Sequence, residues 1–240
     1  MTWRDQCAVV IPCFNEEADI AGLVRGARRF VETVVVVDDG STDSTASFAA
    51  EAGAIVIRHS ERNGKGAALM RGFLVARERG LAHVLCMDGD GQHAVADIPA
   101  FFECCERTNA GLIIGNRFEG KGPMPSVRRV VNLLMSKALS WVAGEELPDT
   151  QCGFRLLRLS LLSAVETRSK HFEFESELLI EIIKAGGRVA FVPIETIYRS
   201  EQSKISPVKD TVRWFSWLLP SLIAAPFRRG RSLVPAEQRL

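Results

Sequence analysis

The chain has 240 residues, of which 47% are hydrophobic and 25% are charged, a composition that suits one globular domain and leaves too little length for a second complete one. Thirty Lys and Arg stand against 29 Asp and Glu, for a net charge of +1, so no overall field favours nucleic acid as a partner. Any anion that the protein binds must therefore meet a local cluster of positive charge.

Short apolar runs alternate with helical patterns along the first half of the chain. The expected strands are 8–12, 34–38, 54–57, 83–88 and 112–115, and the expected helices are 17–30, 43–52, 65–79 and 95–108. Gly53 and Gly80 follow two of these helices, where a left-handed residue commonly ends a helix. The alternation predicts an α/β fold, a mostly parallel sheet covered by helices on both faces.

The rhythm changes after Gly115, where a loop rich in glycine and proline begins. The later elements expected are a helix at 126–142, a helix at 174–185, a strand at 188–194 and a helix near 208–223. We interpret the chain as a single domain, 1–240, in three parts: a nucleotide-binding half at 1–115, an acceptor-shaping half at 116–212 and an amphipathic, basic tail at 213–240.

The six cysteines form no C-x-x-C pair, and several lie in apolar runs, where a free Cys behaves as a small hydrophobe. We expect reduced thiols and a cytoplasmic protein. The first apolar run is too short for a signal peptide or a membrane span. The longest one, 214–227, is interrupted by two serines and two prolines, so it too is shorter than a spanning helix.

Polar motifs follow the expected strands at the positions where open parallel sheets bind ligands. In DGDGQH, Asp88 and Asp90 flank a glycine, and Gln92 follows. Hard oxygen ligands at this spacing suit Mg²⁺ or Mn²⁺, which would bridge the protein and a diphosphate. A plain turn is the alternative. A calcium loop of the EF-hand type is disfavoured because its twelfth position falls on Pro99, where a bidentate Glu is needed.

Two further segments carry chemistry. In VVVVDDGSTDST, Asp39 ends a strand and could accept hydrogen bonds from a base or ribose, whereas Asp43 or Ser44 is expected to cap the following helix. In RNGKGAAL, Lys65 opens a helix between two glycines, a place that favours an anionic phosphate. It is not a Walker loop, since no Ser or Thr follows the lysine.

Taken together, these motifs resemble family 2 glycosyltransferases of the GT-A (Rossmann-like) fold, and most of all dolichyl-phosphate mannosyltransferases and their bacterial polyprenyl-phosphate relatives. The resemblance runs from about residue 7 to residue 212 in the right order. The segments that carry it are PCFNEE, VVDDGSTDST, NGKGAAL, DGDGQH, GNRF, DTQCGFRLL, FEFESELL and VPIETIY.

The resemblance implies a site of two parts. Residues that match the nucleoside contacts of the family are Pro12, Phe14, Glu16, Val37 and Asp39, with Phe14 at a position that is often Tyr. Residues that match the contacts to the sugar nucleotide are Asp88, Gly89 and Asp90, and the metal ligands are Asp88, Asp90 and Gln92.

Three cations complete that implied site. Arg117 of GNRF matches an arginine near the transferred sugar and the acceptor phosphate, and Arg199 and Lys204 match cations that hold the donor diphosphate. The match of Arg199 needs a gap of one residue, and Tyr198 could take its place. We expect Asp90 and Arg117 to be the catalytic residues.

The family inverts the anomeric carbon in one displacement. A phosphate monoester, with a second pKa of about 6, is already anionic at neutral pH, whereas a hydroxyl acceptor needs a general base. Members that build long polysaccharides usually carry Q-x-x-R-W, but here Gln151 is followed by CGFR. We therefore expect an undecaprenyl or dolichyl phosphate as acceptor. The alternative is a hydroxyl of a cell-envelope glycan or glycolipid, with Asp149 as the first candidate for the base.

Basic residues beside apolar helices, such as Arg128 and Arg129, suit peripheral binding to a membrane surface, but such helices could equally pack on the core. A sugar nucleotidyltransferase is disfavoured because PCFNEE is not a glycine-rich loop, and a non-catalytic binding protein is disfavoured because both aspartates are present. The sequence leaves open the sugar, a GDP- or UDP-linked donor, the preferred metal and the oligomeric state.

Overall fold

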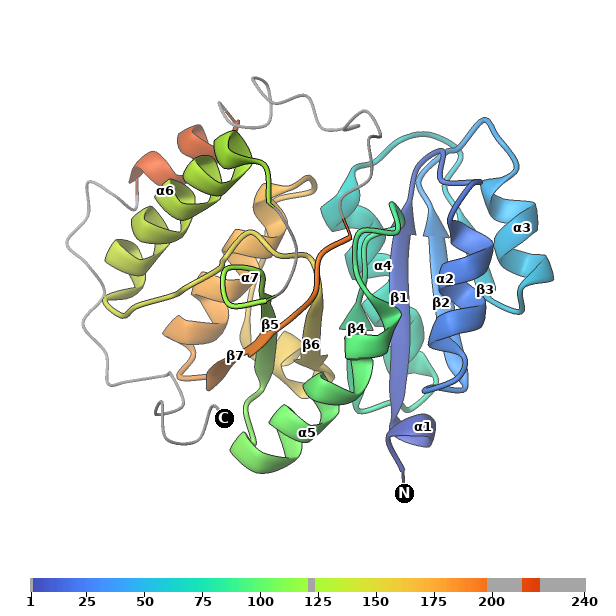
Figure 1. Ribbon diagram of the computed structural model, residues 1–240, viewed down its shortest axis with the longest axis horizontal. Coiled ribbons are helices and arrows are strands. Elements are labelled where there is room, and N and C mark those ends of the chain that lie inside the picture. The colour runs from blue at the N-terminus through green and yellow to red at the C-terminus, as the bar shows by residue number, and fades with distance from the viewer. Residues whose placement is uncertain (1, 121–123, 198–212, 221–240) are drawn as a thin grey trace.

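A seven-stranded sheet forms the centre of the computed structural model, which describes residues 2–120, 124–197 and 213–220 (Figure 1). Its strands are β1 Cys7–Cys13, β2 Thr33–Asp38, β3 Ile55–Arg58, β4 His83–Cys86, β5 Leu112–Asn116, β6 Arg155–Arg158 and β7 Val189–Pro193. Their order is β3-β2-β1-β4-β6-β5-β7, and only the pairs that β6 makes are antiparallel. The prediction of a mostly parallel sheet is confirmed.

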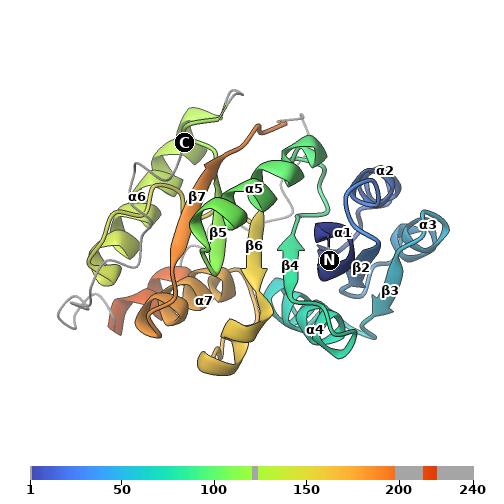
Figure 2. The same ribbon diagram turned by 90° about the horizontal axis from the view of Figure 1, so that it is seen from below.

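Helices cover both faces of this sheet. They are α1 Trp3–Gln6, α2 Ile20–Ala27, α3 Thr45–Glu51, α4 Lys65–Glu78, α5 Ile98–Thr108, α6 Ser126–Ala143 and α7 Glu173–Lys184, with 3₁₀ turns at Val95–Asp97 and Leu159–Ala164. Figure 2 shows α4 and α7 on one face, α2 and α5 on the other, and α6 beyond β7. Because both faces are covered, the central strands are continuous apolar runs.

The strand β6 is the one strand of this sheet that the sequence did not predict. Its four residues, RLLR, begin and end with charge, so neither a run nor an alternation marks it. It is inserted antiparallel between β4 and β5, with Leu156 opposite both Leu85 and Ile113. Partners far away in the chain therefore decide that this segment is a strand.

Other expectations about local structure are confirmed. Gly53 and Gly80 have φ of +93° and +74° and follow α3 and α4, as expected of residues that end helices. The helix expected near 208–223 is described at 213–220, where the chain is helical and Trp214 Nε1 donates to Ser176 Oγ of α7 at 2.9 Å. The remainder of that expected helix lies outside the described residues.

The six cysteines are all buried free thiols, as the sequence predicted. Of the helices that the structure describes, none is both long enough and apolar enough to cross a membrane.

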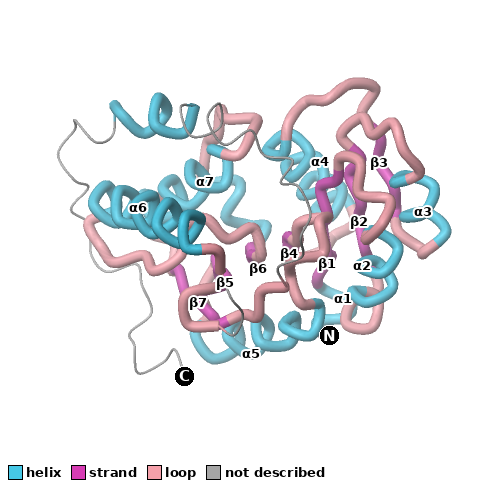
Figure 3. The backbone as a smooth tube through the Cα atoms, turned by 45° about the horizontal axis from the view of Figure 1, so that its top comes forward, coloured by secondary structure: helices cyan, strands magenta, loops and turns pink. Residues whose placement is uncertain are grey.

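The strand order reverses direction between β1 and β4. The chain runs outward from β1 through β2 to β3, and β4 then lies on the other side of β1. In open α/β sheets, ligands bind in the crevice outside the carboxyl ends of the strands at such a switch point. The carboxyl edge of this sheet is at the top of Figure 1 and is turned towards the viewer in Figure 3.

Gly72 lets α4 lie close to β1, and this contact provides a test of the packing. A Cβ atom at position 72 would overlap Cγ1 of the buried Val10. We expect Gly72→Ala to lower the free energy of unfolding by about 1–3 kcal/mol, because a methyl group forced into a packed core displaces its neighbours. Urea unfolding measures the change.

The control is Gly22→Ala in α2, where an added Cβ would have no atom within 4 Å. It should leave stability unchanged or raise it by up to about 1 kcal/mol, through helix propensity alone. Equal effects of the two substitutions would contradict the described packing of α4.

Candidate active site

The DGDGQH loop lies directly against the end of β1. A Cβ added to Gly89 would come within 2.8 Å of Cys13 Sγ and 3.3 Å of the Pro12 carbonyl oxygen. Since a side chain at position 89 would push the loops apart, glycine allows the loop after β4 to touch the loop after β1. The two motifs, which begin 76 positions apart in the sequence, therefore share one site at the switch point of the sheet.

The loop after β1 is held by the loop after β2. The backbone N–H of Glu16 donates to Thr45 Oγ1 at 2.8 Å, and that of Asn15 donates to Ser41 Oγ at 2.9 Å. Asn15 has φ of +55°, a left-handed conformation that asparagine tolerates. Phe14, half-buried, lies under the guanidinium of Arg62, 4.3 Å from its ring centre. The aromatic ring and Glu16 thus occupy an ordered rim of the crevice.

Two of the predicted nucleoside contacts lie deeper. Val37 is fully buried in β2, so its side chain belongs to the core. Asp39, 4% exposed, accepts the backbone N–H groups of Asn63 and Gly64 at 2.9 and 2.8 Å and is 2.8 Å from His59 Nδ1. Its carboxylate fixes the loop that leads into α4.

The expected cap of α3 is provided by Asp43. Its Oδ1 accepts the backbone N–H of Thr45 at 3.0 Å, and its Oδ2 accepts that of Glu17 at 3.3 Å. Ser44 is the N-cap residue by position, but its side chain makes no capping hydrogen bond. Asp43 therefore satisfies donors at the helix start and ties it to the β1 loop.

Lys65 binds two carboxylates at once. Its Nζ is 2.6 Å from Asp88 Oδ1 and 2.7 Å from Glu175 Oε2, and 14% of its side chain is exposed. Burial alone would lower the pKa of Lys65, but the two carboxylates raise it well above its usual value. The lysine is therefore a permanent cation that joins α4 to the DGDGQH loop and to α7.

Glu175 is a residue of the site that sequence reasoning missed. The guanidinium of Arg155 extends the charged cluster: its Nε is 3.8 Å from Glu175 Oε1, and its Nη1 donates to the Glu175 carbonyl oxygen at 2.6 Å. Glu175 lies in the first turn of α7, where the neighbouring Phe174 and Ser176 are buried as well. A buried acidic residue requires a cation, but this burial depends on tertiary packing, so no local pattern in the sequence marks Glu175.

Asp88 and Asp90 have opposite electrostatic environments. Burial would raise the pKa of Asp88, but nearby cations, above all Lys65, lower it to about 2. Burial and then the negative charge of Asp88 raise the pKa of Asp90 to about 6. Asp90 Oδ1 accepts the backbone N–H of Gln92 at 3.1 Å. The loop therefore holds one carboxylate that Lys65 compensates and one, Asp90, for which burial and the charge of Asp88 outweigh the nearby cations.

The buried ring of His93 contacts both the backbone and the carboxylate of Asp88. The residue is 5% exposed, its ring stacks on Phe154 with centroids 5.0 Å apart, and its Nδ1 accepts the backbone N–H of Asp88 at 3.2 Å. Burial lowers the pKa of His93 to about 4, so the ring is neutral at pH 7. Because Nδ1 accepts, the proton is on Nε2, which lies 3.9 Å from Asp88 Oδ2.

Arg117 is fixed by Asp149. The guanidinium donates through Nε and Nη2 to Asp149 Oδ2 and Oδ1 at 2.7 and 2.8 Å, and the Arg117 backbone N–H also donates to Oδ2 at 3.1 Å. Asp149 is fully buried and accepts a further backbone N–H, from Gln151. Its carboxylate is fully engaged, and the charge of Arg117 still reaches Asp88, whose pKa it helps to lower.

Two more segments meet the DGDGQH loop. Arg128, near the start of α6, donates from Nη1 to Gln92 Oε1 at 3.1 Å. The chain after β7 returns to the same loop, where the Ile197 N–H donates to the Gln92 carbonyl oxygen at 3.0 Å and His93 bridges to Thr196. Arg199 and Lys204, predicted to hold the donor diphosphate, lie outside the described residues.

The architecture defines a class of protein. A parallel sheet with one antiparallel strand, and an acidic loop at its switch point, is the GT-A fold of glycosyltransferases. The chain resembles the crystal structure of glucosyl-3-phosphoglycerate synthase from Mycobacterium tuberculosis, in complex with Mn²⁺, uridine diphosphate and phosphoglyceric acid. The TM-score is 0.72 at 22% identity, over 92% of this chain and 80% of that one.

Sequence comparison then gives the family. Residues 8–165 match glycosyl transferase family 2, and the chain belongs to this family. It is 29% identical to an undecaprenyl-phosphate mannosyltransferase of Micrococcus luteus, over 85% of this chain and 92% of the relative. It is also 29% identical to a UDP-N-acetylglucosamine–dolichyl-phosphate N-acetylglucosaminyltransferase of Methanococcus voltae, over 79% and 85%. The protein is a glycosyltransferase, as the motifs predicted.

The double ion pair of Lys65 can be tested by stability. We expect Lys65→Met to lower the free energy of unfolding by about 3 kcal/mol, because it leaves two largely buried carboxylates without their shared cation. Urea unfolding at neutral pH measures the loss.

Lys184→Met is the matched control. Lys184 forms an ion pair with Glu181 on the surface of α7, with 41% and 30% of the two side chains exposed, and its loss should cost no more than about 0.5 kcal/mol. Similar small losses for both variants would show that Lys65 does not stabilise the cluster.

Proposed function

We propose that this glycosyltransferase moves a sugar, with inversion, from a nucleoside diphosphate to a polyprenyl phosphate, with the help of a divalent metal ion. The names of its relatives support a lipid phosphate as the acceptor, since both the bacterial and the archaeal relative act on a polyprenyl-type phosphate. Their sugars differ, so the sugar and the choice of GDP or UDP are left to experiment.

The donor side rests on the rim formed by the loops after β1 and β2. In this proposal the base of the nucleotide stacks on the ring of Phe14, and Pro12 and Glu16, in the same segment, contact the nucleoside. Asp39 and Lys65 position other residues on the donor side. Asp39 fixes the loop that leads into α4, and Lys65 forms an ion pair with Asp88. In this proposal Arg199 and Lys204 provide the positive charge for the diphosphate.

A divalent metal suits the DGDGQH loop for two reasons. First, the raised pKa of Asp90 reports a carboxylate short of positive charge, which a cation beside it would restore. Second, Asp88, Asp90 and Gln92 bring oxygen atoms to one short loop, and Mg²⁺ commonly takes only one or two protein carboxylates and completes its shell from phosphates and water. Asp88, Asp90 and Gln92 would hold it, and its charge would stabilise the departing nucleoside diphosphate.

The observation that best supports a phosphate as the acceptor is that both carboxylate oxygens of Asp149 already accept hydrogen bonds. This carboxylate was the first candidate for a general base, yet both its oxygens accept hydrogen bonds from Arg117, and Oδ1 also accepts one from Gln151. A hydroxyl acceptor would require a base, whereas an anionic phosphate requires only positioning. Asp149 instead orients Arg117, and the charge of Arg117, with that of Arg128 nearby, would attract the acceptor phosphate.

This acceptor also gives the place of action. A polyprenyl phosphate is a membrane lipid, so the enzyme would work at the cytoplasmic face of a membrane, as a peripheral protein.

The metal can be tested on Asp90. Asp90→Asn should reduce sugar transfer by at least about 100-fold, because it removes a charged ligand from the place where the leaving group is stabilised. Calorimetry with UDP and with GDP should show that Mn²⁺ or Mg²⁺ strengthens nucleotide binding to the unmodified enzyme and has no such effect on the variant.

Asp97→Asn is the control, since Asp97 accepts the Glu195 N–H at 2.8 Å outside the loop. It should retain metal-dependent binding. Full transfer in the presence of EDTA would refute the metal site.

The acceptor can be tested by supplying radiolabelled sugar nucleotide with a short-chain polyprenyl phosphate, or with the free polyprenol and simple glycosides. We expect label in the phosphate product alone, and that product should be acid-labile. Arg117→Lys should reduce transfer strongly, because lysine cannot reproduce the two bonds to Asp149. Equal transfer to hydroxyl acceptors would overturn the proposal.

A further inference from the structure

The outward side of α6 is unusually apolar. The structure describes ten exposed large hydrophobic side chains, and six of them lie on this one helix, with exposed fractions between 38% and 79%. They are Val127, Val130, Val131, Leu133, Leu134 and Trp141, which we call the α6 face. Single exposed apolar side chains are ordinary, but a contiguous patch marks a surface that binds something.

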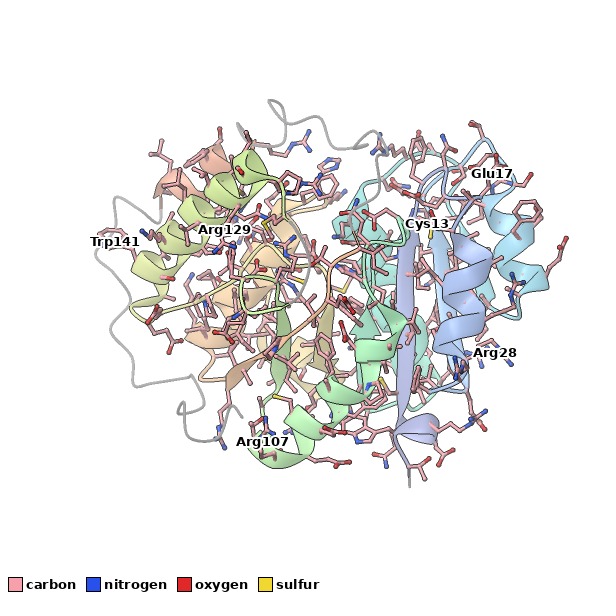
Figure 4. The ribbon with its side chains drawn as sticks, viewed as in Figure 1. Cys13, Glu17, Arg28, Arg107, Arg129 and Trp141 are labelled. Carbon is pink, nitrogen blue, oxygen red and sulfur yellow. The ribbon has the colours of Figure 1, made fainter. Side chains whose placement is uncertain are left out.

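Both sides of α6 carry apolar side chains: Leu139, Val142 and Ala143 are buried, whereas the α6 face is exposed. The buried side also includes the polar residues Asn132 and Ser136, and Ser136 Oγ is hydrogen-bonded to Thr150 at 3.1 Å. The exposed apolar side chains of the α6 face recur at spacings of three and four residues, which form one stripe along the helix. Figure 4 shows Trp141 at the outer edge of the molecule. Packing against the part of the chain that the structure describes therefore does not explain this stripe.

The charges on α6 indicate what the face binds. The helix contains no acidic residue, and its charges are Arg128, Arg129 and Lys137, of which Arg129 and Lys137 are exposed. Two copies of this face packed together would bring these cations towards each other, which disfavours a second copy of the chain. An apolar stripe with tryptophan and flanking cations instead suits the interface of a bilayer that contains anionic lipid.

We infer that the α6 face lies in the surface of an anionic membrane and docks the enzyme there. The helix spans about 27 Å, so it can rest along the bilayer surface. Its first turns reach the candidate site, because Arg128 is hydrogen-bonded to Gln92. Insofar as the acceptor is a lipid phosphate, which rests on the proposed function, this docking presents the crevice to a headgroup in the same membrane.

Flotation of the full-length protein with vesicles tests the docking. Vesicles of phosphatidylcholine with about 30% phosphatidylglycerol should carry the unmodified protein upward in a density gradient. Val130→Asp with Leu134→Asp should lower the bound fraction at least tenfold, because two charges would enter the apolar interface. Lys137→Gln should lower binding about fivefold on the same vesicles and leave binding to pure phosphatidylcholine unchanged.

Phe48→Asp is the matched control, since Phe48 is 40% exposed on α3 at the opposite end of the molecule (Figure 1). It should float as the unmodified protein does. Circular dichroism checks that each variant is folded, and should the double variant fail to fold, the lysine variant decides.

A water-soluble, short-chain acceptor separates this inference from the proposed function. The docking variants should transfer sugar to it normally and lose transfer only to acceptor embedded in vesicles. Flotation that the variants do not reduce would overturn the docking, and so would an unmodified protein that stays at the bottom. A dimer that the double aspartate variant dissociates would assign the face to a second copy. Binding gained only after removal of residues 221–240 would assign it to the chain's own C-terminal segment.

Discussion

One ammonium group holds the candidate site together. Lys65 lies between Asp88 after β4 and Glu175 on α7, so it joins three elements that meet only in the folded protein. It can do so because α4 and α7 approach closely: a Cβ at Gly66 would overlap Phe174, and Gly64 adopts φ of +101° against the chain at 170–171. The position of the acidic loop therefore depends on the packing of two helices behind it.

This arrangement makes two neighbouring aspartates unequal. Lys65 compensates Asp88, whereas Asp90, two residues further on, meets burial and the charge of Asp88. The raised pKa of Asp90 means that added positive charge beside it would be favourable. Two further cations already act on the loop: Arg117 helps to lower the pKa of Asp88, and Arg128 is hydrogen-bonded to Gln92. A loop of uniform negative charge would repel any phosphorylated ligand, and this division of charge avoids that.

The helix α6 connects this chemistry with the surface of the molecule. Arg128 is hydrogen-bonded to Gln92 of the acidic loop, and Ser136 on the buried side is hydrogen-bonded to Thr150, while six large apolar side chains are exposed on the outer side. This one helix thus contacts the acidic loop at its first turn and is exposed along its outer side. Because the helix is stiff along its length, the orientation of one side fixes that of the other.

The sequence by itself determined the parallel sheet, the places of most helices, the acidic motifs and the family, because fully covered strands are continuous apolar runs and each motif is a short local string. Only the tertiary structure decided that RLLR is a strand, that Lys65 binds Glu175, that Arg117 binds Asp149 and that the apolar side of α6 faces outward. The first three depend on partners far away in the chain, and the last depends on the described residues that pack around α6. Local patterns carry no information about which distant surface a residue will meet.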